Sequence, residues 1–310
     1  MPSIVKPASL NPGDTIGIMA PGSSIDPEAF KFGCFTFESA GYQVVPDEQC
    51  YKKHHQSAGT AKDKAEALEE LYLNDQINAI ILASGGNRTL HFLDLIDFNV
   101  ISHNPKIIMG YSDCTALLGA IQAHTGQCVI HGPTITWFGK DNISDKAGQL
   151  DKVLACLQGD LTDMDMSQAT SICSGEAQGP LIGGNLSLIM HMIFTRWCPD
   201  LKGAILYLED TGDELSWLDR DFWYLKETGI LQEISGLVLG GFSLGDSGRP
   251  FGFTLEDILK EHMADLDIPI VTNAPFGHND VLHPLPFGAH GVLKASGEHV
   301  SLEFESPVSK

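Results

Sequence analysis

The sequence predicts an α/β protein with an N-terminal domain, in which helices flank a parallel sheet, and a smaller C-terminal α/β domain. Short, wholly apolar segments such as residues 79–83 alternate with longer segments such as 61–73, whose apolar residues share one helical face. Short apolar runs are typical of buried parallel strands, and their alternation with helices is typical of a parallel α/β sheet. Polar loops containing glycine or serine follow several of the predicted strands. Ligands of such sheets bind at the carboxyl ends of the strands, so these loops are the first candidates for a functional site.

The first half of the chain supplies most of this pattern. Predicted strands occupy residues 15–20, 42–45, 79–83, 107–110 and 128–130. Predicted helices occupy residues 27–40, 61–73 and 115–121, and a further helix carries Leu90, Leu93 and Leu95. The polar loops at strand ends are residues 21–24, 84–88 and 111–113. These loops should converge on one edge of the sheet.

The pattern fades between Gly159 and Gly179, where the chain is polar and unperiodic. Such stretches are typical of domain boundaries, so we expect an N-terminal domain at 1–160, a linker at 161–178 and a C-terminal domain at 179–310. Predicted elements of the second half are a turn and apolar helix at 181–189, strands at 204–208, 237–239 and 268–271, and an amphipathic helix from 215 to 225. The pair Gly183-Gly184 either cradles a phosphate or allows close backbone packing.

Composition restricts the classes of function. The 310 residues are 43% apolar and 19% charged, which is ordinary for a soluble globular protein of two domains. The formal net charge of −21 argues against binding nucleic acid or an anionic membrane surface. A small anion held by a few local groups remains compatible with this charge.

The cysteines and the apolar runs indicate the compartment. The seven cysteines are odd in number and no pair has CxxC spacing, so we expect free thiols rather than disulfides or a structural zinc site. Residues 1–7 lack the apolar core of a signal peptide, and no apolar run reaches transmembrane length. These observations predict a cytoplasmic protein.

Ser112 is the candidate nucleophile. The apolar run at 107–109 stops at Gly110, Ser112 follows two residues later, and helical apolar spacing resumes at Thr115. A strand, a tight turn and a helix would lift the hydroxyl clear of the sheet and aim the amide of the next residue at a bound group. The usual motif has glycine where Cys114 stands, and the alternative interpretation is a serine that caps the helix.

Glu209 and His278 are the candidate partners of this serine. Glu209 ends a predicted strand, and His278 follows a glycine in a loop after another predicted strand. A glutamate that orients a histidine, which in turn removes the serine proton, completes a catalytic triad. The alternatives are an acidic residue that only solvates a loop, and a metal site formed by His278 and His283. No further ligand completes a convincing metal set, so a general base is the preferred interpretation.

The sequence resembles the LD-carboxypeptidase family of serine peptidases, which also contains the microcin C immunity proteins. The motifs that carry the resemblance, in order along nearly the whole chain, are Lys6-Pro7, residues 10–14, 20–23, 58–60, Ser84-Gly85-Gly86, residues 110–113, 131–133, 183–186, 208–210 and 276–278. The resemblance implies Ser112 as nucleophile, His278 as base and Glu209 as its partner. It also implies an oxyanion hole formed by the amide of Asp113 and an amide of the Gly85-Gly86 turn.

The resemblance further implies a cytoplasmic homodimer without metal or cofactor, which removes the terminal D-alanine of murein tetrapeptide during cell-wall recycling. Two departures leave the substrate side chain open. Many members have arginine before the glycine pair and an aromatic residue after it, whereas here Ser84 precedes and Asn87-Arg88 follow. A common Tyr-Arg pair is replaced by Ser216-Trp217.

The function predicted is therefore a serine carboxypeptidase acting on a small peptide. One alternative is an immunity-type hydrolase of a peptidyl-nucleotide toxin, in which Trp137 or Trp217 would stack on the base. Another is a binding module that kept the fold and lost catalysis. Arg88 is the candidate for contacting a substrate carboxylate, and its alternative role is to pair with Asp94 or another acid on the following helix.

Overall fold

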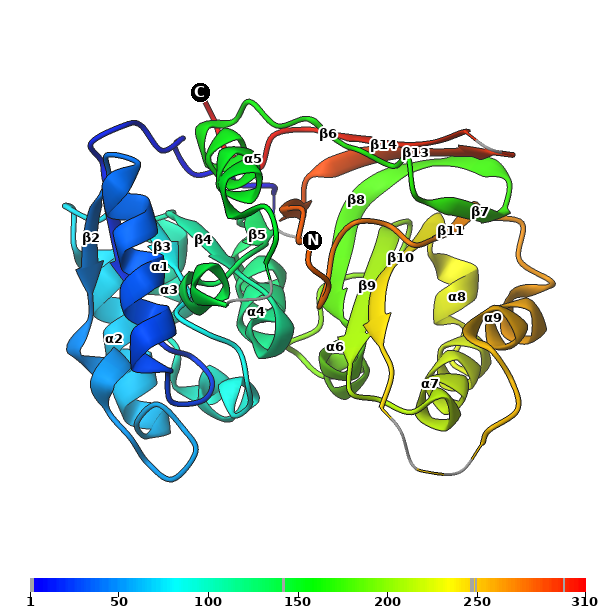
Figure 1. Ribbon diagram of the computed structural model, residues 1–310, viewed down its shortest axis with the longest axis horizontal. Helices are drawn as coiled ribbons and strands as arrows, with labels where there is room; N and C mark the ends of the chain where they lie inside the picture. The colour runs from blue at the N-terminus through cyan, green and yellow to red at the C-terminus, as the bar shows by residue number, and fades with distance from the viewer. Residues whose placement is uncertain (1–2, 141–142, 246–247, 249, 298) are drawn as a thin grey trace.

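The computed structural model describes residues 3–140, 143–245, 248, 250–297 and 299–310. Within these residues the strands form two sheets, of six and eight strands, which lie side by side in Figure 1. The first sheet has the order β12 (Leu285–Phe287), β5 (Val129–His131), β4 (Ile107–Gly110), β3 (Ala79–Ile81), β1 (Thr15–Ile18) and β2 (Gln43–Pro46). Strands β1 to β5 are mutually parallel, and β12 pairs antiparallel with β5.

The order of the parallel strands reverses between β1 and β3. In open α/β sheets the crevice outside the carboxyl ends of two such strands is where ligands bind. The loops that follow β1 and β3 are residues 19–26 and 82–88. The topology therefore places the predicted loops 21–24 and 84–88 at the favoured ligand-binding edge.

Helices cover both faces of this sheet. The helices of the N-terminal half are α1 (Pro27–Ser39), α2 (Ala61–Leu73), α3 (Phe98–His103), α4 (Thr115–Thr125) and α5 (Lys146–Gln158), with 3-10 turns η1 (Glu48–Tyr51), η2 (Thr89–Leu95), η3 (Ser112–Cys114) and η4 (Ile135–Gly139). Helix α1 packs on η4, whereas α2, α3 and α4 contact one another in sequence. Capping defines the boundaries of α2, because Thr60 and Asp63 form a reciprocal capping box at its first turn.

The second sheet has the order β6 (Asp163–Met164), β14 (His299–Phe304), β13 (His290–Ser296), β8 (Gly175–Asn185), β9 (Ile205–Thr211), β10 (Gly236–Ser243), β11 (Ile270–Thr272) and β7 (Thr170–Cys173). Strands β8 to β11 are parallel, and the outer strands pair antiparallel. The helices of this half are α6 (Leu186–Met192), α7 (Leu215–Glu227), α8 (Ile230–Glu233) and α9 (Leu255–Met263). The predicted α/β class is thus confirmed in both halves.

Three segments differ from expectation. The expected linker 161–178 contains β6, β7 and the start of β8, all of which belong to the second sheet. Its strands are partly exposed, so they lack the apolar signal of a central strand. Residues 181–185, expected as a turn, continue β8. The distant β12 completes the first sheet, so the chain crosses from the second sheet back to the first.

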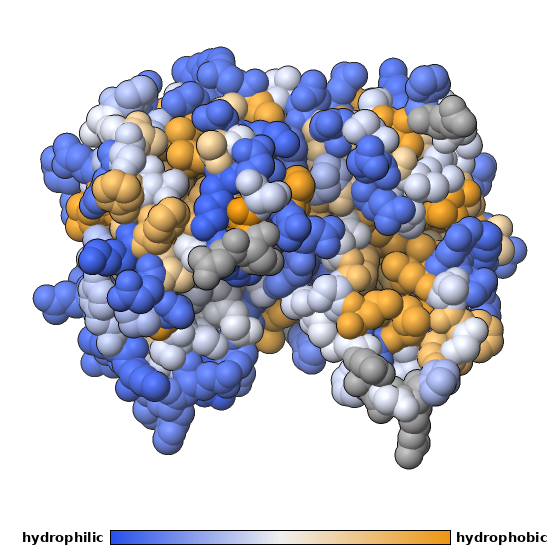
Figure 2. All heavy atoms as spheres, in the orientation of Figure 1, coloured by the Kyte–Doolittle hydropathy of each residue, from blue (hydrophilic) through white to orange (hydrophobic). Residues whose placement is uncertain are grey.

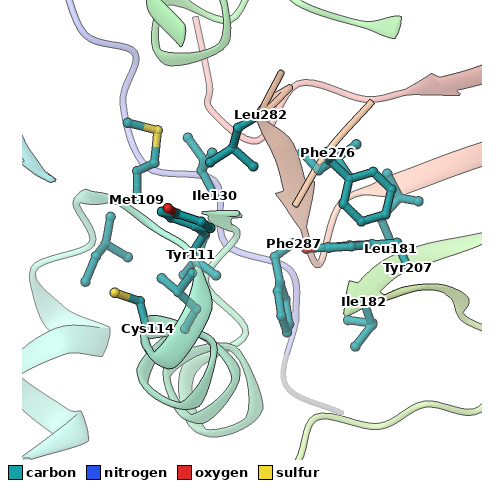
Figure 3. Close-up of a cluster of buried hydrophobic side chains, with 14 of the residues drawn as sticks. Met109, Tyr111, Cys114, Ile130, Leu181, Ile182, Tyr207, Phe276, Leu282 and Phe287 are labelled. Atoms are coloured by element: carbon teal, nitrogen blue, oxygen red, sulfur yellow. The ribbon is translucent and has the colours of Figure 1, made fainter. Parts of the chain in front are cut away.

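An apolar cluster joins the two halves. Figure 3 shows Met109, Ile130 and Phe287 of the first sheet, together with Tyr111, which follows β4. Leu282 lies near them, and Tyr207 and Phe276 lie beyond. All of these side chains are buried. Burial of large apolar side chains across the junction stabilises the relative position of the two sheets.

Most of the face shown in Figure 2 is hydrophilic, and apolar residues gather over the half that contains the second sheet. Exposed aromatic side chains of that half include Trp217, Trp223, Phe251 and Phe253. In the described part of the chain, no helix combines the length and hydrophobicity that crossing a membrane would require.

Candidate active site

Ser112 lies in the turn between β4 and α4, as predicted, with a φ of +63°. Residues other than glycine rarely adopt this left-handed conformation, which costs about 1–3 kcal/mol and is found mostly at functional sites. Gly110 makes the turn possible, because a Cβ there would lie 2.9 Å from Leu82 Cδ1 and 3.0 Å from Cys114 Cβ. The capping alternative is wrong: the residue that precedes α4 is Cys114, and Ser112 is the first residue of η3.

The loop after β3 lies directly against this serine. A Cβ at Gly85 would lie 3.1 Å from Ser112 Oγ and 3.4 Å from the amide nitrogen of Asp113. Gly86 has a φ of +102°, and a Cβ there would lie 2.2 Å from Ser23 Oγ. Glycine at position 85 therefore lets the backbone approach Ser112, and glycine at position 86 lets it approach Ser23.

Asp113 fixes this loop through its side chain. Its carboxylate is 5% exposed and accepts hydrogen bonds from Thr89 N at 2.9 Å and Thr89 Oγ1 at 2.6 Å. The sequence suggested only the backbone amide of Asp113 as functional. The structure adds a side chain that holds the Gly85–Thr89 loop over the serine.

Glu209 and His278 form a hydrogen-bonded pair. The fully buried Glu209 lies on β9, and its Oε2 is 2.6 Å from His278 Nδ1. Gly277 permits this contact, because its φ is +102° and a Cβ there would lie 2.6 Å from Glu209 Cβ. Burial raises the pKa of Glu209, and the hydrogen bond with His278 opposes that shift. With the glutamate ionised, Nδ1 donates and Nε2 is left as the basic nitrogen.

Tyr111 connects this pair to the serine turn. The rings of Tyr111 and His278 are 4.9 Å apart between centroids, and Lys140 Nζ donates to Tyr111 Oη at 3.0 Å. Burial raises the pKa of Tyr111, and the nearby Glu209 adds to the shift. No hydrogen bond joins Ser112 to His278 in the described part of the chain, and catalytic hydrogen bonds are often long before substrate binds. Tyr111 was not singled out from the sequence, although it directly precedes the candidate nucleophile.

A second network of hydrogen bonds holds Asp210, the residue that follows Glu209 on β9. Asp210 accepts hydrogen bonds from Asn185 Nδ2 at 2.9 Å and from Ser187 N and Oγ at 2.8 Å each. Ser187 Oγ also lies 2.9 Å from Asp213 Oδ2. These contacts fix the end of β9 to the start of α6. Gly183 serves close packing rather than phosphate binding, because a Cβ there would lie 1.7 Å from the carbonyl oxygen of Tyr207.

The remaining candidates have different surroundings. Arg88 has a φ of +86° and an exposed side chain, and Asp94 pairs with Arg196 instead of with Arg88. Trp137 is 1% exposed and packs on Phe138, so its ring faces no solvent. Trp217 is 56% exposed.

The surroundings of His283 differ from those of His278. It is buried, its Nδ1 lies 3.0 Å from the carbonyl oxygen of Pro284, and burial lowers its pKa to about 4. Among the described residues, no group of three or more histidine, cysteine, aspartate or glutamate side chains is arranged to hold a metal ion.

Comparisons with known proteins match both halves of the chain to one family. Residues 16–132 match the model of the LD-carboxypeptidase N-terminal domain, and residues 178–293 match that of the C-terminal domain. A probable murein peptide carboxypeptidase of Bacillus subtilis is 30% identical over 300 residues, which cover 96% of this chain and 94% of that protein. The microcin C7 self-immunity protein of Escherichia coli is 27% identical and covers 95% of this chain and 94% of its own length.

Solved structures show the same architecture. Muramoyltetrapeptide carboxypeptidase from Oxalobacter formigenes superposes with a TM-score of 0.85 at 27% identity, covering 95% of this chain and 100% of that chain. The microcin immunity protein bound to glutamyl sulfamoyl guanosine has a TM-score of 0.90 at 24% identity, covers 98% of this chain and 99% of its own, and shares the fold. The two domain matches and the relative at 30% identity show that this chain belongs to the LD-carboxypeptidase family of serine peptidases.

Proposed function

We propose that this protein is a cytoplasmic serine carboxypeptidase that hydrolyses the L,D-peptide bond before the terminal D-alanine of murein tetrapeptide. One observation carries the proposal: the buried Glu209–His278 pair lies against Tyr111, the residue that precedes the strained Ser112. Relatives named as murein peptide and murein tetrapeptide carboxypeptidases support the substrate class.

The chemistry follows from the roles of the three side chains. Ser112 Oγ attacks the carbonyl carbon of the L-configured centre, and His278 Nε2 takes the hydroxyl proton. Glu209 holds the imidazole in the required tautomer and stabilises its charged form. The C–N bond then breaks, His278 returns the proton to the leaving amine of D-alanine, and water hydrolyses the resulting ester by the reverse sequence. No metal or cofactor is required for these steps.

The oxyanion is proposed to bind the amide of Asp113 and an amide of the Gly85-Gly86 turn. The close approach of Gly85 to both Ser112 Oγ and the Asp113 nitrogen supports this assignment. Preorganised amides of this kind typically contribute 10²- to 10³-fold to kcat each. Arg88 follows the same turn and is proposed to contact the terminal carboxylate of the substrate.

A peptidyl-nucleotide hydrolase is the second candidate function. The exposed indole of Trp217 favours it, because an aromatic ring open to solvent is available to stack on a base. The buried Trp137 is not available for this role. A homodimer is proposed as well, since exposed aromatic side chains of the second half would be covered by a partner.

The test is mass spectrometry of the purified protein incubated with murein tetrapeptide or with a peptidyl-nucleotide. Release of D-alanine from the tetrapeptide is the expected result, and cleavage of only the peptidyl-nucleotide would favour the second function. Ser112→Ala should reduce turnover roughly 10⁴-fold or more. Ser102→Ala, which changes an exposed serine on α3, is the matched control. Turnover by a folded Ser112→Ala protein within tenfold of wild type would contradict a serine mechanism.

A further inference from the structure

A cavity of about 310 Å³ opens beside the Gly85–Thr89 loop, and we call it the basic cavity. Its titratable lining residues are His54, His55, Lys64, Arg88 and His91. No aspartate or glutamate is among its described lining residues, although the chain has 40 acidic residues and 19 lysines and arginines. A lining of one sign in a strongly acidic protein indicates a local site for an anion.

Lys64 is the buried part of this lining. It is 1% exposed, and its Nζ donates to the carbonyl oxygen of Gly22 at 2.9 Å. No carboxylate of the described chain lies within ion-pair distance of Lys64, and an ammonium group has three donors. Burial lowers the pKa of Lys64 to about 8, with Arg88 adding to the shift and Asp113 opposing it. An anion in the cavity would offset this desolvation.

Arg88 stands at the rim of the cavity. Its backbone φ is +86°. Arg88 forms no ion pair with any residue that the structure describes. Asn87 Nδ2 donates to Gln56 Oε1 at 3.0 Å, which ties the loop of Arg88 to the loop of His54 and His55. Arginine and lysine with free donors are the side chains that bind carboxylates most strongly.

The basic cavity is connected to the serine through the backbone. Lys64 bonds to Gly22, and a Cβ at Gly22 would lie 2.1 Å from the carbonyl oxygen of Gly85. Gly85 in turn lies against Ser112. The cavity also adjoins the loops that follow β1 and β3, where the strand order reverses. A group bound there can therefore belong to the same molecule that is cleaved at Ser112.

We propose that the basic cavity is a subsite for a second carboxylate of an acidic peptide substrate, held by Lys64 with the histidines around it, while Arg88 at the rim contacts the terminal carboxylate. This inference rests on the proposed peptidase function. It specifies that substrates carry an internal acidic group in addition to the terminal carboxylate. Murein tetrapeptide has two such groups, on its glutamate and on its diaminopimelate.

The test compares murein tetrapeptide with two analogues, each amidated at one internal carboxylate. Lys64→Met keeps the length of the side chain and removes its charge, and Lys62→Met on the exposed side of the same helix is the control. Removing a charge-assisted hydrogen bond should raise KM for the acidic peptide roughly 10- to 100-fold. For one of the two amidated analogues, KM of the Lys64→Met variant should stay within threefold of the wild-type KM. The kcat of the variant should differ little from wild type for all three peptides.

Calorimetric binding to the Ser112→Ala protein gives a readout that does not need turnover. Adding Lys64→Met should weaken binding of the acidic peptide and spare the same amidated analogue. If Lys64→Met still turns over the peptides but raises KM equally for all three, the subsite is overturned and the peptidase function stands. Absence of both turnover and peptide binding would overturn the two proposals together. Binding of inorganic phosphate that depends on Lys64, with peptide affinity unchanged, would show a site for a free anion and overturn the subsite.

Discussion

Acid should destabilise this protein through a buried neutral histidine, His131, beneath the candidate active site. Its ring is fully buried on β5, and neither ring nitrogen has a hydrogen-bond partner in the described chain. The rings of Tyr207 and Phe276 lie 5.6 and 6.1 Å from it. Burial, aided by the nearby His278, lowers the pKa of His131 to about 3.

The direction of the pH effect on the free energy of unfolding follows from proton binding in the folded and unfolded states. An unfolded histidine binds a proton below about pH 6.5, whereas His131 in the folded protein stays neutral down to about pH 3. The unfolded state therefore binds more protons in this window, and the free energy of unfolding falls by about 1.4 kcal/mol per pH unit. At pH 5 the loss is about 2 kcal/mol from His131. His283, with a pKa lowered to about 4 by burial, contributes a further loss of about 2 kcal/mol.

The assay is urea unfolding followed by circular dichroism at several pH values from 8 to 5. His131→Phe should show a pH-dependent loss about 2 kcal/mol smaller than wild type at pH 5, even if its stability at pH 8 is lower. His299→Gln, at an exposed position on β14, should follow the wild-type curve. Equal losses in His131→Phe and wild type would refute the reasoning. Direct titration of the His131 ring by NMR gives the same answer if the variant folds poorly.

Four further predictions concern the candidate site. Glu209→Gln should keep the fold and lower kcat roughly 10³- to 10⁴-fold, because the imidazole loses its charged partner; kcat within tenfold of wild type would argue against this role. Gly277→Ala should lower stability by about 1–3 kcal/mol and reduce turnover, because its Cβ would meet Glu209. Gly13→Ala, which shares a positive φ but has open space around it, should reduce stability alone. Exhaustive chelation should leave activity and Tm unchanged, and activity lost and then restored by zinc would contradict a histidine base. Arg88→Met should raise KM for a free-acid peptide more than for its C-terminal amide, whereas equal increases would show a structural role.

The sequence by itself predicts those parts of the site that depend on residues close together along the chain. The turn at Ser112 requires Gly110 before it, and the apolar run and helix around it predict the strand and the helix that the structure shows. The apolar run predicted that a strand ends at Glu209, whereas β9 continues to Thr211 and Glu209 lies within it. The glycine before His278, which is visible in the sequence, is the residue that allows His278 to approach Glu209. The resemblance of the motifs to the LD-carboxypeptidases then predicted the family that the comparisons show.

Only the tertiary structure decides which segments pair and which side chains are buried between the two halves. Strand β12 joins the first sheet although it lies far from its partner β5 along the chain. The partly exposed strands of 161–178 join the second sheet. Local polarity does not encode either pairing, because the backbone hydrogen bonds are made to a distant sheet edge. Tertiary packing also decides three features of the site. Tyr111 contacts His278, the ring nitrogens of His131 lack hydrogen-bond partners in the described chain, and Lys64 and Arg88 line one cavity. Each depends on side chains from separate elements, so its physical cause is the packing of the sheets rather than any pattern along the chain.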